Sequence, residues 1–202
     1  MTWFDLTMPL SEKTPVFPGD PPAEFRSMAQ DGCNQKQLSF SSHFGTHMDA
    51  PYHMLDDGKK LSDYPVDRFV GLALVFDVRG QNEIRLSEVE LGRIQSGEFV
   101  FFFTGHSDKA FLPGYFENNP VIPLDTAEAL IDAGVTLVGL DSFTPDNVPY
   151  SVHKLLFRHD VLILENLVDL ADLAGKRVEV VVAPLPILNG DGAPCRVLAR
   201  PV

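Results

Sequence analysis

The sequence predicts an α/β fold, a single domain whose mixed, partly barrel-like β-sheet is flanked by a few helices. Short runs of β-branched and aromatic residues recur along the chain, as is typical of buried strands. Helix start signals lie between some of these runs. No repeat, low-complexity tract or polar linker divides the 202 residues. We therefore expect one domain spanning residues 1–202.

The first segment of the chain is rich in proline. Five prolines and Gly19 fall between Pro9 and Pro22. This density excludes a helix and predicts an extended, turn-containing segment that covers the body of the protein.

From Gln37 onwards, apolar and polar side chains alternate, which predicts a half-buried strand with a polar face. Its expected apolar side chains are Leu38, Phe40, Phe44 and Met48. Five buried strands are expected further along, at residues 70–78, 99–103, 135–140, 161–164 and 178–183. One helix is expected to begin with a capping box at Ser87–Glu90, and another to run from Asp125–Glu128 to Gly134.

Charge and hydrophobicity exclude two classes of function. The chain carries 28 acidic and 16 basic side chains, a net charge of −12, which repels nucleic acid and anionic lipid. Its apolar runs are far shorter than the ~20 residues of a membrane span. The first residues lack the basic and apolar regions of a signal peptide, so we expect a cytoplasmic protein. Cys33 and Cys195 show neither a disulfide framework nor a thiolate metal motif.

Four candidate metal ligands or proton carriers occur within eleven residues: His43, His47, Asp49 and His53. Imidazole and carboxylate groups together are ligands that zinc and manganese prefer. An isolated histidine is more often a structural residue, but this clustering favours a metal or acid/base site. On a straight strand, His43 and His47 would be ~13 Å apart, too far to share an ion. The strand must therefore bend, and Gly45 is the residue that permits it.

The segment HFGTHMDAPYH (residues 43–53) resembles the HxGTHxDxPxH signature of the metal-dependent hydrolases called the cyclase family. The resemblance extends over nearly the whole chain. It includes FDLTMPLSEKTPVFPGDPP near the start, GVTLVGLDSFTPD and HKLLFRHDVLILENL in the second half, and APLPILNGDGAPCRVLA near the end. It implies a swivelling β/β/α fold.

The resemblance also implies a ligand set. His43, His47 and Asp49 match the first metal ligands of the family, with Asp49 at the position that bridges when two ions bind. His153 and Glu165 match the later ligands. His153 is preferred to His159 because the twelve-residue step from His153 to Glu165 is the spacing found in the family. The implied cofactor is a divalent metal, zinc or manganese, as one or two ions.

His53 matches the catalytic histidine of the family, which stands near the metal without binding it. Zinc lowers the pKa of a bound water to about 7, so a nucleophile exists at neutral pH without an external base. A histidine with an ordinary pKa of about 6.5 can accept the proton of this water and pass it to the departing amine.

The chain departs from the family at Phe103-Thr104-Gly105-His106, where many members have an arginine followed by Thr-Gly-Trp. His106 is a candidate substrate-binding residue, with a polar structural role as the alternative. Phe17, before Pro18-Gly19-Asp20, is a second candidate that lines an aryl pocket or packs among the prolines. The altered stretch leaves the identity of the substrate open.

The resemblance implies a metal-dependent amidohydrolase that cleaves a small amide, with an aryl formamide such as N-formylkynurenine or a cyclic amide such as isatin as leading substrates. Two alternatives remain open. One is a cyclase or dehydratase acting on a small oxygenated metabolite, and the other is an inactive metal-binding module. A homodimer is the expected assembly, because symmetric dimers are the commonest among soluble proteins.

Overall fold

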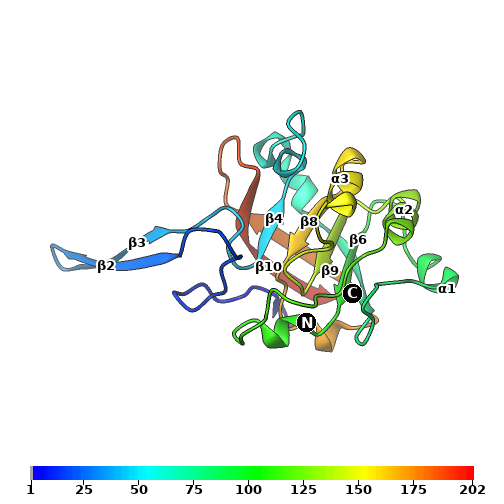
Figure 1. Ribbon diagram of the computed structural model, residues 1–202, viewed down its shortest axis with the longest axis horizontal. Coiled ribbons are helices and arrows are strands. Elements are labelled where there is room, and N and C mark those ends of the chain that lie inside the picture. Colours follow the sequence, from blue (N-terminus) through cyan, green and yellow to red (C-terminus); the bar gives the residue numbers. More distant parts are fainter. Residues whose placement is uncertain (1) are drawn as a thin grey trace.

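The computed structural model describes residues 2–202, and its body is an eight-stranded mixed sheet (Figure 1). The strands follow the order β1-β10-β4-β8-β7-β6-β5-β9, and β10 also pairs with β9. This last pairing closes the strands from β10 through β9 into a barrel. The strands are β1 (Phe4–Asp5), β4 (His47–Asp49), β5 (Val70–Asp77), β6 (Phe99–Phe103), β7 (Leu137–Leu140), β8 (Leu162–Glu165), β9 (Arg177–Pro184) and β10 (Gly192–Pro201).

The barrel is parallel on one side and antiparallel on the other. Strands β5, β6, β7 and β8 run parallel to one another, and helical connections join them. Strand β4 instead pairs antiparallel with both β8 and β10. The barrel-like mixed sheet expected from the sequence is therefore confirmed, and β4 lies between strands from distant parts of the chain.

Alternation along the strands builds two apolar layers. In β6, Phe99, Phe101 and Phe103 face the barrel interior, where they pack with side chains from every strand of the closed sheet. The intervening Val100 and Phe102 face outward and pack beneath α2 and α3. Because both faces of β6 are covered, the strand is a continuous apolar run rather than an alternating one.

The helices lie outside the barrel (Figure 1). They are α1 (Glu88–Leu91), α2 (Leu124–Asp132) and α3 (Ser151–Arg158), with 3-10 turns η1 (Pro51–His53), η2 (Leu61–Asp63), η3 (Val66–Phe69), η4 (His106–Lys109) and η5 (Ala171–Leu173). The predicted capping box at Ser87 is confirmed. The cap predicted at Asp125 is wrong, because Pro123 precedes the helix and Asp125 lies in its first turn. No helix within residues 2–202 has the length and apolar character of a bilayer span.

The long strand predicted from Gln37 is wrong. Strand β3 (Cys33–Ser39) pairs with β2 (Glu24–Gln30) in a hairpin that projects from the body, with every residue of β3 exposed (Figure 1). The chain then bends through residues 40–46, and β4 begins only at His47. The bend predicted at Gly45 is confirmed, since its φ of 65° lies in the left-handed region. An alternating pattern of apolar and polar residues predicts a strand with two different faces. It does not show which other element, if any, covers the apolar face.

Candidate metal centre

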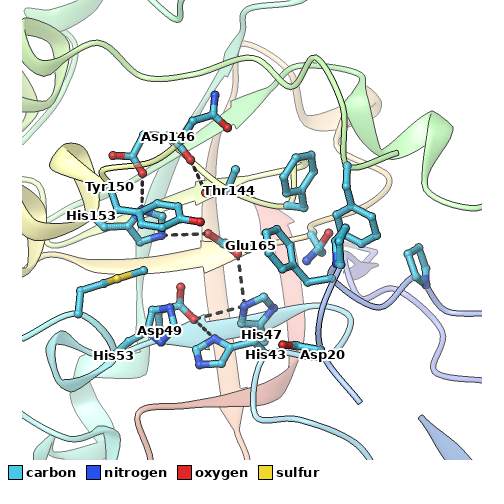
Figure 2. Close-up of a pocket in the computed structure, with 18 of the residues that line it drawn as sticks. Asp20, His43, His47, Asp49, His53, Thr144, Asp146, Tyr150, His153 and Glu165 are labelled. Carbon is cyan, nitrogen blue, oxygen red and sulfur yellow. Dashed lines mark hydrogen bonds and ion pairs between the residues drawn. The ribbon is translucent and has the colours of Figure 1, made fainter. Parts of the chain in front are cut away.

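Strands β4 and β8 place three ligand groups on the outer face of the barrel. His47 lies directly opposite Glu165 in this antiparallel pair, and Asp49 shares the face of His47 because it lies two residues further along. One ligand atom from each of these three buried residues lies within 4.8 Å of the other two. His47 Nε2 is 3.3 Å from both Asp49 Oδ1 and Glu165 Oε2 (Figure 2). The expected convergence of these side chains is therefore present in the fold.

Helix α3 adds His153 from the opposite side of Glu165 (Figure 2). Its Nε2 lies 3.4 Å from Glu165 Oε1, and its Nδ1 is hydrogen-bonded to Asp146 Oδ1 at 2.5 Å. The other oxygen of Asp146 accepts the backbone N–H of Val152 at 2.6 Å, which fixes the start of α3. The carboxylate of Asp146 binds Nδ1 of the ring, so Nε2 is directed at Glu165. Metal-binding histidines are held in the same way.

The donor set fits a divalent cation. Glu165 Oε1 is buried and accepts no hydrogen bond from the described residues, which is a costly state for a carboxylate oxygen. The histidines and carboxylates around it offer the nitrogen and oxygen ligands that zinc and manganese take. A cation at this position would satisfy the unpaired oxygen.

A second group of ligand atoms adjoins the first. His43, Asp49 and His53 also have ligand atoms within 4.8 Å of one another. The bend at Gly45 folds His43 back over Asp49, so that His43 Nδ1 lies 2.8 Å from Asp49 Oδ1. His53 follows in η1, with its ring centroid 4.0 Å from that of His43. Asp49 thus belongs to both groups.

Asp191 belongs to the site although no sequence motif marks it. It lies in the segment Leu188–Pro194, which the glycine content marks only as a loop. The pairing of β10 with β4, in which Gly192 lies opposite Asp49, brings it to the site. Asp191 Oδ2 is 2.8 Å from His43 Nε2 and 3.6 Å from His53 Nδ1. No local motif signals this contact, because it depends on a strand pairing between distant segments.

The histidines and carboxylates of the centre perturb one another strongly. Burial alone would lower the pKa of His43, but Asp49 and Asp191 raise it to about 9. Burial likewise opposes protonation of His153, whose pKa is raised to about 9 by Asp146 and Glu165. Burial would raise the pKa of Asp49, whereas His43 and the neighbouring His47 hold it well below its usual range. The carboxylates of the centre therefore stabilise positive charge on the groups next to them.

A cavity of about 580 Å³ opens onto the centre. Its wall includes Phe17, Phe116 and Phe143, with ring centroids 5.1–6.3 Å apart. Phe17, Pro15 and other residues of the proline-rich segment line the cavity, so this segment is indeed a cover. One side of the cavity is thus aromatic, and the other side carries the histidines and carboxylates.

His106 does not line this cavity. Its side chain is buried, its Nε2 is hydrogen-bonded to the carbonyl oxygen of Tyr115 at 2.8 Å, and its ring packs 5.6 Å from that of Phe143. Burial lowers the pKa of this imidazole. The expectation that His106 contacts substrate is corrected on this geometry, because its ring lies behind the aromatic wall and supports it.

A closed mixed sheet with a buried group of histidines and carboxylates fits the class of metal-dependent hydrolases. The chain belongs to the Cyclase family, whose family model, described as "Putative cyclase", matches residues 4–147. It is 34% identical to a kynurenine formamidase from Bacillus cereus over 207 residues, which cover 99% of this chain and 98% of that protein. A kynurenine formamidase from Bacillus anthracis is 33% identical with the same coverage.

Two solved structures share the fold. Isatin hydrolase A from Labrenzia aggregata, bound to benzyl benzoate, is 26% identical with a TM-score of 0.88, covering 98% of this chain and 93% of that one. A potential metal-dependent hydrolase with cyclase activity is 30% identical with a TM-score of 0.82, covering 98% of this chain and 96% of that one. The expected family and fold are therefore confirmed.

Proposed function

We propose that the protein hydrolyses the C–N bond of a small aryl amide. The observation that carries this proposal is the convergence of His47, Asp49 and Glu165, with an unpaired buried oxygen, at the floor of an aromatic-walled cavity. His153 and Glu165 are proposed as ligands beside His47 and Asp49, and His43 with Asp49 as ligands of a second ion. A divalent cation held there would supply Lewis acidity and lower the pKa of water.

The protein's own residues supply binding and proton transfer. The aromatic wall formed by Phe17, Phe116 and Phe143 binds an aryl group and keeps water from one side of the amide. His53 lines the same cavity, so its imidazole is placed to accept a proton from the attacking water. The same imidazole then donates this proton to the departing nitrogen. For an aryl formamide, amide and water give formate and an aryl amine.

The relatives and the shape of the cavity support this substrate class. The similar Bacillus proteins are kynurenine formamidases, and a structure with the same fold is an isatin hydrolase. Both names denote substrates in which the amide nitrogen is attached to an aromatic ring. We propose an aryl formamide first and a cyclic aryl amide second. A ring-closing or dehydrating reaction is the alternative that the family description suggests.

The test combines metal analysis with a substrate panel. Protein purified without chelator and then loaded with zinc or manganese should hold one or two ions per chain. It should release formate from formanilide or N-formylkynurenine, or open isatin, and His53→Ala should reduce kcat by about 10²-fold or more while leaving bound metal unchanged. Loaded protein that turns over none of these amides, but closes a ring in an oxygenated substrate, would support the cyclase alternative.

We further propose that the protein is a homodimer in which the β2–β3 hairpin contacts a second copy. An isolated two-stranded hairpin is marginally stable, and this one exposes Met28 and Leu38, at 40% and 50%. Light scattering should give twice the chain mass. Leu38→Glu should shift the protein to monomer while leaving the barrel folded, and a monomeric parent protein would contradict the proposal.

A further inference from the structure

Asp191 is a half-buried neighbour of the centre that is not itself among the proposed metal ligands. Asp191 is not one of the described residues that line the cavity. It contacts the site through His43 and His53. His43 Nε2 lies 2.8 Å from its Oδ2, and His53 Nδ1 lies 3.6 Å from the same atom. Asp191 therefore stands behind the imidazole that faces the substrate cavity.

The carboxylate of Asp191 is itself held in place. Ser42 donates its hydroxyl to Oδ1 at 2.9 Å, so both carboxylate oxygens have partners. The backbone on either side is fixed as well, because Ala50 donates its N–H to the Asp191 carbonyl and Leu61 donates its N–H to the Gly190 carbonyl, both at 2.9 Å. The loop is thus tied to the segments before and after His53.

We infer that Asp191 is a positioning residue that orients the His53 imidazole for proton transfer. A carboxylate facing Nδ1 favours the tautomer with the proton on that nitrogen, which leaves the Nε2 lone pair free for the substrate side. The 3.6 Å separation is longer than a hydrogen bond. Such contacts are often long in a protein without substrate and shorten in the reacting complex.

This inference rests on the proposed amide hydrolysis, and the substrate comparison is chosen to separate the two. Amide cleavage needs a proton on the departing nitrogen, whereas 4-nitrophenyl formate releases a stable phenolate without one. If Asp191 orients the proton-carrying His53, Asp191→Asn should lower kcat for formanilide by about 10²-fold with less than about a threefold change in KM. The loss on the ester should be smaller, because His53 then acts only on the attacking water and not on the leaving group.

A matched control and a metal measurement complete the experiment. Asp132→Asn makes the same chemical change at an exposed position on α2 and should leave both activities unchanged. Because Asp191 also contacts the proposed ligand His43, its loss should weaken zinc affinity, but Asp191→Asn should still bind stoichiometric zinc at the saturating concentration used in the assays. Equal losses on amide and ester, or loss of zinc, would overturn the inference while leaving the proposed hydrolysis standing.

A spectroscopic readout tests the inference without turnover. In zinc-loaded protein labelled with ¹⁵N-histidine, the neutral His53 ring should carry its proton on Nδ1, and Asp191→Asn should produce a mixture of tautomers. An unchanged tautomer in the variant would overturn the inference. If the parent protein hydrolyses neither substrate, the proposed function fails, and this measurement still decides whether Asp191 orients His53.

Discussion

Gly192 is the residue at which the structure makes the sharpest steric prediction. It lies opposite Asp49 where β10 pairs with β4. A Cβ added there would lie 2.8 Å from the backbone oxygen of Met48 and 2.9 Å from His43 Cε1. Its φ is outside the left-handed region, so the effect of Gly192→Ala is crowding rather than backbone strain.

The size of the effect follows from these contacts. Overpacking against a backbone atom costs about 1–3 kcal/mol, and reduced freedom of the unfolded chain offsets about 0.4–1 kcal/mol. The midpoints of the two ranges leave a net loss of about 1.3 kcal/mol, which lowers Tm by about 3–5 °C in a chain of this size. Displacement of His43 and Asp49 should also reduce kcat/KM for formanilide, since a shift of about 1 Å in a reacting site costs about 10²-fold.

Calorimetry and formate release measure the two effects, and Gly92→Ala is the matched control. Gly92 follows α1 with φ −64°, and a Cβ there would approach no atom closer than 3.3 Å. This variant should match or slightly exceed the parent in Tm and should keep full activity. If Gly192→Ala behaved as Gly92→Ala does, the close packing of β10 against the metal centre would be refuted.

Three further predictions concern the metal, the substrate and acid stability. Glu165→Gln should weaken binding of zinc by more than about 100-fold in chelator competition, because an amide lacks the charge of the ligand, and full retention would exclude Glu165 from the centre. An aryl formamide with a ring carboxylate should show kcat/KM lower by about tenfold than its methyl analogue, because a carboxylate placed against the aromatic wall loses water and finds no Lys or Arg among the described lining residues; equal values would contradict this. Burial opposes ionisation of Asp160, but Lys59 and Tyr64 hold its pKa below the ordinary value. The ionised carboxylate therefore stabilises the folded protein above about pH 4, and this stabilisation is lost as the pH falls. Denaturant titrations at pH 7 and pH 3 should therefore show a smaller acid-induced loss of unfolding free energy for Asp160→Asn than for the parent. Equal losses would contradict a stabilising role of the Asp160 carboxylate.

The sequence by itself determined much of the barrel and the grouping of the first candidate ligands. The apolar runs at residues 70–78 and 99–103 coincide closely with β5 and β6, because β6 and residues 73–76 of β5 are buried and must be apolar there. The spacing of His47 and Asp49 placed both on one strand face, and Gly45 marked the bend. These features are local, so composition and periodicity suffice to predict them.

Only the tertiary structure decided how distant segments meet. It separated the predicted strand from Gln37 into an exposed hairpin and the short β4, and it placed His106 behind the aromatic wall. It also capped the start of α3 with the carboxylate of Asp146, and brought Asp191 to His53 by pairing β10 with β4. A contact across some 140 residues of chain depends on which strand edges pair, and the free energy of that choice belongs to the whole closed sheet rather than to any segment.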